Sequence, residues 1–178
     1  MKEIKIKDVM IPLSNYVTIK EENTLYDVFQ ILEKNRTSSH AHRDAIVIDE
    51  TGAFKGKVTM IDIFKALEPN YTKLFKNYKD GTLTKEYVLN AVKDLGLWVE
   101  PMKTLCERGM DIRVSEVMHV PKSSEFIQEE DSVETALHEY VMGVHQPLMV
   151  KNNEKVTGVL RFGDLFEIIR KRMLACPI

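Results

Sequence analysis

A seven-residue segment of this chain occurs twice, 108 positions apart. Residues 19–25 read IKEENTL and residues 127–133 read IQEEDSV. In both segments two glutamates precede Asn-Thr or Asp-Ser, whose side-chain oxygens can accept hydrogen bonds from the free N–H groups of a starting helix. A strand-to-helix junction built twice explains this recurrence. An internal repeat is therefore the feature that most constrains the fold.

The repeat extends on both sides of the junction. Upstream, IKIKDVM at residues 4–10 aligns with IRVSEVM at 112–118 at the same offset. Downstream, an apolar stripe with helical spacing follows each junction and predicts one buried helix face per copy. The stripe consists of Leu25, Val28, Phe29 and Leu32 in the first copy, and of Val133, Ala136, Leu137 and Tyr140 in the second.

Beyond this helix the offset decreases to 102, so that residues 45–67 align with 147–169. The change predicts six additional residues in the first copy, within 35–44. Turn residues at 49–52 and 152–153 separate β-rich runs, as in a hairpin. Each copy is thus predicted to be a βαββα unit, and the fold class is mixed α/β, of the α+β kind.

A segment between the copies, residues 69–111, has no counterpart in the repeat. Within this segment a stripe of apolar residues has helical spacing and stops just before Gly96, so Gly96 is expected to mark the C-terminus of a helix. The stripe consists of Leu83, Tyr87, Val88, Ala91, Val92 and Leu95. With Phe75, Leu97 and Trp98 it is too apolar for a free linker. We expect two or three short helices that pack on the repeats or on a neighbouring chain.

The composition favours a soluble, cytoplasmic protein. The net charge is −2 and no basic block indicates nucleic acid. Neither end carries a long apolar run, so we expect no signal peptide and no membrane span. Cys106 and Cys176 are the only cysteines, which fits free thiols in a reducing compartment.

Each copy ends with a glycine, a short strand and an aspartate that opens the last helix. These residues are Gly56 and Asp62 in the first copy, and Gly158 and Asp164 in the second. Together with DVM followed by Pro12, and EVM followed by Pro121, they resemble the CBS-domain family, specifically a tandem pair that forms a Bateman module. The resemblance implies two pseudo-twofold related motifs packed sheet to sheet, at 1–68 and 112–178, with 69–111 as a helical insert.

The resemblance also implies a ligand and its contacts. Clefts between the two motifs commonly hold AMP, ADP, ATP, S-adenosylmethionine or a related compound. The family's aspartate contacts the ribose hydroxyls, and a Thr or Ser three positions earlier reaches ribose or phosphate. These roles map onto Asp62 with Thr59, and onto Asp164 with Arg161. An ionised carboxylate can accept from both hydroxyls of a cis-diol, and a helix N-terminus favours phosphate.

Further contacts carried over from the family concern adenine, which backbone groups and apolar side chains usually recognise. The corresponding residues are Ile11 and Pro12 with Ala45 and Ile46 in the first copy, and His119 and Val120 with Pro147 and Leu148 in the second. All of these could equally be ordinary core residues. Arg43 and His145 align just before the second strand of each copy and could face phosphates, although most surface arginines and histidines bind no ligand.

Two alternatives concern the pair of residues assigned to the ribose in each copy. Thr59 and Asp62 have the spacing of a capping box, in which both side chains serve only the helix N-terminus. Arg161 stands where the first copy has Thr59, and it could either contact a ligand phosphate or fill the second cleft and leave it empty. A glycine on the preceding strand, such as Gly56, allows a ligand or another backbone to approach closely.

Signatures of catalysis and of metal binding are lacking. The sequence contains no P-loop, G-x-S-x-G, H-E-x-x-H or G-x-G-x-x-G motif. His40 and His42 form an H-x-H pair without a third ligand at suitable spacing, and Cys106 has no neighbouring histidine. We therefore expect a regulatory module for signal transduction, with no catalytic residues and no metal.

Partners are predicted from the resemblance and from the helices. The family implies a homodimer, for which the apolar ends of the second helices, such as Ile168 and Ile169, could supply contacts; a protein target that responds to the ligand is also expected. One alternative is a ligand-free scaffold that binds a partner through 69–111. Another is an enzyme or metal protein that uses His40, His42 or Cys106.

Overall fold

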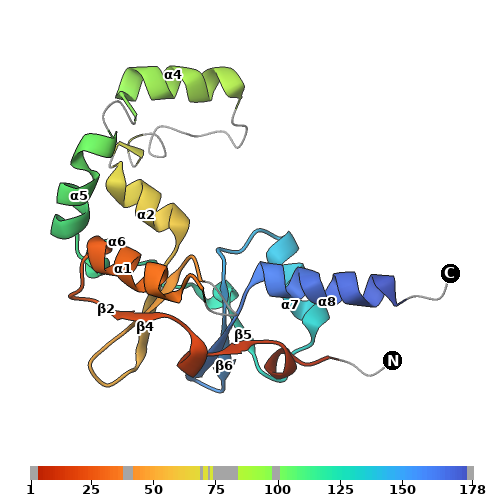
Figure 1. Ribbon diagram of the computed structural model, residues 1–178. Coiled ribbons are helices and arrows are strands. Elements are labelled where there is room, and N and C mark those ends of the chain that lie inside the picture. The colour runs from red at the N-terminus through yellow and green to blue at the C-terminus, as the bar shows by residue number, and fades with distance from the viewer. Residues whose placement is uncertain are drawn as a thin grey trace. The chain divides into compact units, whose positions relative to one another are not determined.

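The computed structural model describes residues 4–37, 42–68, 70–71, 73, 84–97 and 101–175. The chain forms two compact units. Unit 1 comprises Met1–Val17 and Val120–Ile178, and unit 2 comprises Thr18–His119. Each unit has its own sheet and helices (Figure 1). Outside the described residues lie His40, Phe75, Leu83, Trp98 and Cys176.

Unit 2 contains the β and α elements of the first copy. Its three-stranded sheet has the order β2-β3-β4, with β2 parallel to β3 and β3 antiparallel to β4. The elements are β2 (Thr18–Lys20), α1 (Leu25–Asn35), β3 (Ala45–Ile48), β4 (Phe54–Val58) and α2 (Met60–Leu67). Their order confirms the βαββα unit predicted from the repeat.

Unit 1 contains the second copy in the same order. Its four-stranded sheet has the order β1-β7-β6-β5. The elements from the second copy are η3 (Ser123–Glu125), β5 (Phe126–Gln128), α7 (Val133–Val141), β6 (Leu148–Asn152), β7 (Lys155–Leu160) and α8 (Phe162–Leu174). The elements from the N-terminal segment are η1 (Ile6–Asp8), β1 (Ile11–Pro12) and η2 (Leu13–Asn15). A mixed α/β fold with two sheets is therefore confirmed.

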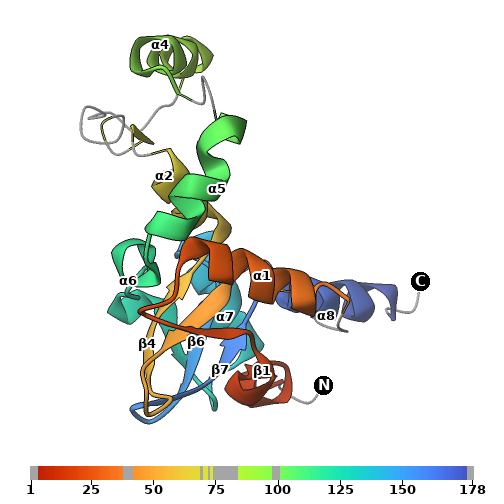
Figure 2. The ribbon, with the colours of Figure 1, turned by 60° about the vertical axis from the view of Figure 1, so that its left-hand side comes forward.

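The N-terminal segment packs on the second copy rather than on the first. The amide of Ile6 donates to the carbonyl of Asp131 at 3.0 Å, and Val133 donates to Ile4 at 3.1 Å. β1 then pairs with β7, as Figure 2 shows, with Ile11 opposite Val159. Unit 1 therefore contains the first seventeen residues of the chain together with the second copy.

The segment that begins the second copy packs on the first in the equivalent manner. Helix α6 (Val114–Val117) belongs to unit 2. The amide of Val114 donates to Asn23 at 2.8 Å, and Leu25 donates to Ile112 at 2.9 Å. Val114 and Leu25 are the repeat equivalents of Ile6 and Val133, so the two copies exchange their leading segments with the same hydrogen bonds.

The hairpins differ in length between the copies. Val47 pairs with Gly56, nine residues further along, whereas Val150 pairs with Gly158, eight residues further along. In the strands before the hairpins the offset between equivalent residues is therefore 103, so Ala45 corresponds to Leu148. The prediction that residues 35–44 hold all six additional residues is wrong, because one of them lies in the hairpin turn.

Asp49 shapes this longer turn in the first copy. Its Oδ1 atom accepts hydrogen bonds from the amide of Thr51 at 2.9 Å, the Thr51 hydroxyl at 2.7 Å and the amide of Ala53 at 3.0 Å. These bonds, led by the Thr51 hydroxyl, lower the pKa of the Asp49 carboxyl from its ordinary value to about 2. The turn predicted at 49–52 is confirmed.

The predicted helix faces are mostly buried. In unit 1, α7 and α8 enclose a core with one face of the sheet. Its buried residues are Ile6, Ile127, Val133, Ala136, Tyr140, Leu148, Val150, Leu160 and Leu165. In unit 2, Leu25 and Val28 are fully buried but Phe29 is 47% exposed. The prediction that Phe29 is buried is wrong, because this side chain lies at the mouth of a cavity of about 560 Å³ lined by residues of α1 and α2.

In the described part of the insert, α4 (Lys85–Leu95) and α5 (Pro101–Asp111) belong to unit 2. α4 ends at Gly96 in a left-handed conformation with φ of 59°, which confirms the predicted C-terminus. α5 contacts α1 and α2, and the guanidinium of Arg108 donates to the carbonyl of Leu67 at 2.5 Å. α5 therefore caps the end of α2. Among the described residues, no helix has the length and hydropathy needed to cross a membrane.

Candidate functional site

Asp62 lies in the first turn of α2, immediately after the sheet of unit 2. Its Oδ2 atom accepts hydrogen bonds from the Thr59 amide at 3.0 Å and the Thr59 hydroxyl at 2.7 Å. Thr59 is buried and is the N-cap of α2, whereas Asp62 is half-buried. The capping box is therefore present. These bonds orient the carboxylate at the start of the helix.

A second capping box of the same form occurs in unit 2. At the start of α1, the Oδ2 atom of Asp27 accepts from the Thr24 amide at 2.8 Å and the Thr24 hydroxyl at 3.0 Å. The bond from the Thr24 amide is the main cause of the lowered pKa of the Asp27 carboxyl. A capping box alone thus does not distinguish Asp62 from Asp27, and the surroundings of each must decide.

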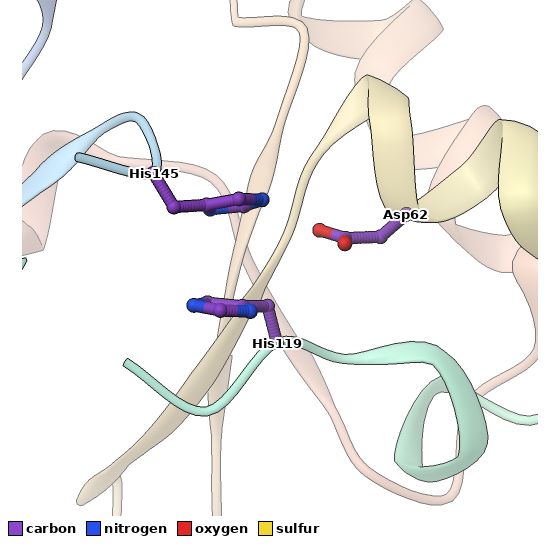
Figure 3. Close-up of side chains that lie close together, drawn as sticks. All are labelled: Asp62, His119 and His145. Atoms are coloured by element: carbon purple, nitrogen blue, oxygen red, sulfur yellow. The ribbon is translucent and has the colours of Figure 1, made fainter. Parts of the chain in front are cut away.

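His119 distinguishes the surroundings of Asp62. One of its ring nitrogens lies within 4.8 Å of a carboxylate oxygen of Asp62, and Figure 3 shows the two side chains approaching from α2 and from the segment after α6. The backbone of His119 is fixed on β4, because its amide donates to the Lys57 carbonyl at 2.8 Å and its carbonyl accepts from the Lys57 amide at 3.0 Å. His145, also drawn, belongs to unit 1.

Gly56 allows this close approach. A Cβ atom at Gly56 would lie 2.9 Å from the carbonyl oxygen of His119. In unit 1 the equivalent Gly158 lies under β1, where a Cβ atom would be 2.8 Å from the Ile11 carbonyl oxygen. The close approach expected from this glycine is confirmed in both units, and the approaching group is the backbone of the exchanged segment.

In unit 1 the same motif has a different geometry. The guanidinium of Arg161 donates from Nε to Oδ2 of Asp164 at 2.7 Å, and from a terminal nitrogen to Oδ1 at 2.8 Å. The side chains are 24% and 31% exposed, respectively. Arg161 is the N-cap residue of α8 but makes no side-chain cap. Both oxygens of Asp164 are therefore engaged by one two-pronged contact.

Comparisons with known proteins agree with the repeat. The family model of the CBS domain matches residues 6–69, and the following solved structures are similar over nearly the whole chain. The CBS-pair protein CBSX2 from Arabidopsis thaliana has a TM-score of 0.62 at 16% identity, covering 98% of this chain and 100% of that one. The chain has the fold of a CBS pair. No curated protein matches its sequence.

Two similar structures are complexes with nucleotides. CBSX2 in complex with AMP has a TM-score of 0.59 at 18% identity, covering 95% of this chain and 98% of that one. The CBS domain of a bacterial CNNM/CorC family Mg²⁺ transporter in complex with ATP has a TM-score of 0.57 at 17% identity. That match covers 93% of this chain and 87% of the transporter domain. At these identities the likeness establishes the fold of this chain.

The candidate residues of each copy lie in both units. Ile11 and Pro12 belong to unit 1, where they pair with Val159 and Gly158, whereas Ala45 and Ile46 lie in β3 of unit 2. His119 pairs with Lys57 of unit 2. The exchange of leading segments therefore divides the candidate residues of each copy between the two units.

The remaining candidates follow this division. Pro147 and Leu148 are buried in unit 1, and Val120, in the same unit, is exposed. Because of the shift in register, Pro147 aligns with Asp44 rather than with Ala45. Ala45 and Ile46 are fully buried, as core residues would be. Arg43 is exposed at the rim of the cavity beside α1 and α2.

One unusual residue was missed by the sequence analysis. Lys57 is fully buried on β4, where the second copy has Val159. Lys55 and Lys57 alternate within FKGKV as the polar residues of a half-buried strand would, so no local signal marks the burial of Lys57. Cys106 is a free, exposed thiol on α5.

Proposed function

We propose that this CBS pair is a regulatory module that binds an adenosine-containing ligand of the AMP, ADP, ATP or S-adenosylmethionine type, without catalysis. The observation that carries the proposal is the Asp62 carboxylate, oriented by Thr59 and placed within 4.8 Å of His119. The structures with AMP and ATP support the ligand class, because their CBS folds resemble this one.

The chemistry of Asp62 fits a ribose. The Thr59 bonds hold the carboxylate at the helix N-terminus. In this proposal the carboxylate would accept hydrogen bonds from the two hydroxyls of a cis-diol. Such charge-assisted bonds are about twice as strong as neutral ones. In this proposal His119 contributes to the wall of the site beside the base, and the fully buried Ala45 and Ile46 support that wall from the core.

Helix α2 connects this position to the insert. Asp62 lies in its first turn, and Leu67 at its other end accepts a hydrogen bond from Arg108 of α5. A ligand can shift a conformational equilibrium only if it binds the two states with different affinities. In the proposed mechanism, ordering of the first turn of α2 changes the stability of the α2–α5 contact, and the insert conveys that change to a protein target.

Thermal unfolding tests the proposal with a matched control. AMP, ADP, ATP and S-adenosylmethionine are added separately to the wild-type chain, and at ~100 times its dissociation constant the binding ligand stabilises the chain by about 2.7 kcal/mol. We expect Asp62→Ala to abolish the rise in melting temperature, and Asp62→Asn, which can still cap the helix, to reduce it strongly. Asp27→Ala removes an equivalent capping box and is expected to retain the rise.

The contradicting results are equally specific. An unchanged melting temperature with every ligand would contradict adenosine binding, and an undiminished rise in Asp62→Ala would place the ligand elsewhere. The first result would favour the scaffold alternative, for which α4 offers exposed Val88, Leu89 and Val92.

We also propose a homodimer, on the evidence of the apolar surface of unit 1. Phe166, Met173 and Leu174 of α8 and Val141 of α7 are exposed, whereas Ile168 packs against the core. The former residues are therefore better candidates for contacts than Ile168. Light scattering of the eluting protein should give twice the chain mass of 20.6 kDa, and Phe166→Glu should shift it towards the monomer. A monomeric wild-type chain would contradict the proposal.

A further inference from the structure

The two copies of the motif differ at the residue that begins the last helix. Thr59 and Arg161 have similar extended backbone conformations, with φ of −104° and −92° and ψ of 168° and 145°. Each is followed three residues later by an aspartate in the first turn of a helix. The backbone scaffold is therefore conserved between the units, and the side chain alone changes the environment of the aspartate.

The two side chains use the carboxylate differently. Both Thr59 donors contact a single oxygen, Oδ2 of Asp62. Arg161 forms a fork, with one donor on each oxygen of Asp164, at 2.7 and 2.8 Å. A cis-diol that binds a carboxylate places two hydroxyl donors in the same way, one towards each oxygen. The guanidinium of Arg161 therefore occupies the positions that the two ribose hydroxyls would need.

Charge makes this occupation difficult to reverse. Arg161 remains protonated at any physiological pH, and a bidentate guanidinium–carboxylate pair is the strongest arrangement of this kind. The pair is less exposed than an ordinary surface ion pair, with 24% and 31% of the side chains accessible. A neutral diol would have to replace charge-assisted donors with weaker ones and leave the arginine to find another partner.

From this geometry we infer that Arg161 closes the second motif to ribose, so that each chain binds one nucleoside ligand, at Asp62. The inference rests on the proposed function of Asp62 and specifies its stoichiometry. Arg161 acts as an internal substitute for the ribose diol. Ligand binding to one chain is then described by a single saturable site. The second motif binds no nucleoside and has a structural role.

Isothermal titration calorimetry with AMP tests the inference. We expect one site per wild-type chain over concentrations up to ~100 times its dissociation constant, and two sites per chain for Arg161→Thr. Arg161→Ser should behave in the same way, and both substitutions introduce favoured N-cap residues, so the helix should be retained. Adding Asp164→Ala to Arg161→Thr should restore a single site.

A matched control lies further along α8. Arg170 pairs with Glu167 at 2.7 Å, three residues away on the same helix. Arg170→Thr therefore removes an ion pair of similar sequence spacing without touching Asp164, and we expect one site. Circular dichroism and the melting temperature of each variant establish that it is folded.

The outcomes separate this inference from the proposed function. Two sites in the wild-type chain, one of them lost in Asp62→Ala, would overturn the inference and leave the proposed function intact. A single site in both Arg161→Thr and Arg161→Ser would also overturn it, because release of the carboxylate would not have opened the motif. Absence of AMP binding in every protein would overturn the inference together with AMP binding at Asp62.

Discussion

Tyr140→Phe should lower the free energy of unfolding by about 2–6 kcal/mol, although it removes only one oxygen atom. The Tyr140 hydroxyl donates to the carbonyl of Leu160 and accepts from the amide of Leu148 at 3.1 Å. It thereby bridges β6 and β7 in the core of unit 1, where Leu148 and Leu160 are fully buried. Phenylalanine would leave both backbone groups without this partner, at a cost of roughly 1–3 kcal/mol each.

Urea unfolding measures this effect. The midpoint should decrease for Tyr140→Phe while the dependence on urea concentration stays the same, because the surface exposed on unfolding is unchanged. Tyr26→Phe provides the control, since Tyr26 is 45% exposed and should change stability by no more than about 0.5 kcal/mol. Equal midpoints for Tyr140→Phe and the wild-type chain would show that the bridge contributes nothing.

Gly158→Ala should destabilise the attachment of the N-terminal segment by about 1–3 kcal/mol, the usual range for overpacking. The added Cβ atom would lie 2.7 Å from the Met10 sulfur and 2.8 Å from the Ile11 carbonyl oxygen. The methionine side chain can move, but the carbonyl is backbone and can move only if β1 shifts away from β7. Hydrogen exchange of the β1 amide at Ile11 should therefore accelerate in the variant.

The matched control for this substitution is expected to change stability in the opposite direction. Gly163 lies in the first turn of α8, and a Cβ atom there would meet nothing within 4 Å. Gly163→Ala should stabilise the chain by roughly 0.4–1 kcal/mol, because alanine loses less conformational freedom on folding. Stability unchanged by Gly158→Ala, with normal protection of Ile11, would contradict the tight contact described between β1 and β7.

Much of the fold could be predicted from the sequence because the repeat supplies two examples of every element. Helical spacing after the doubled junction predicted α1 and α7, and Gly96 marked the end of α4. Each of these signals is local, since a cap or an apolar stripe depends on residues within one or two turns. The capping box of Thr59 and Asp62 was predictable for the same reason.

The exchange of leading segments could not be predicted in this way. IKIKDVM and IRVSEVM are similar, so each segment could equally pack on its own copy or on the other. Hydrogen bonds such as Val114 to Asn23 decide the matter, and they join residues far apart in the chain. The longer hairpin at Asp49 was missed because an alignment without gaps assigns every additional residue to the most polar loop.

The candidate site was predicted as residues rather than as contacts. The sequence identified Asp62, Asp164 and the anomalous Arg161, but it could not show that Arg161 contacts the aspartate of its own turn. Residues three apart at a helix start are neighbours, so the pair was accessible to local reasoning.

Recognition of the ribose diol by Asp62 is tested most directly by comparing AMP with 2′-deoxy-AMP in equilibrium binding to the wild-type chain. The 2′-hydroxyl would donate one hydrogen bond to a charged acceptor, which contributes roughly 1.5–3 kcal/mol. We therefore predict that 2′-deoxy-AMP binds at least about tenfold more weakly, and that Asp62→Ala removes the difference. Equal affinities for the two nucleotides, or a difference that persists in Asp62→Ala, would contradict a carboxylate that binds the ribose.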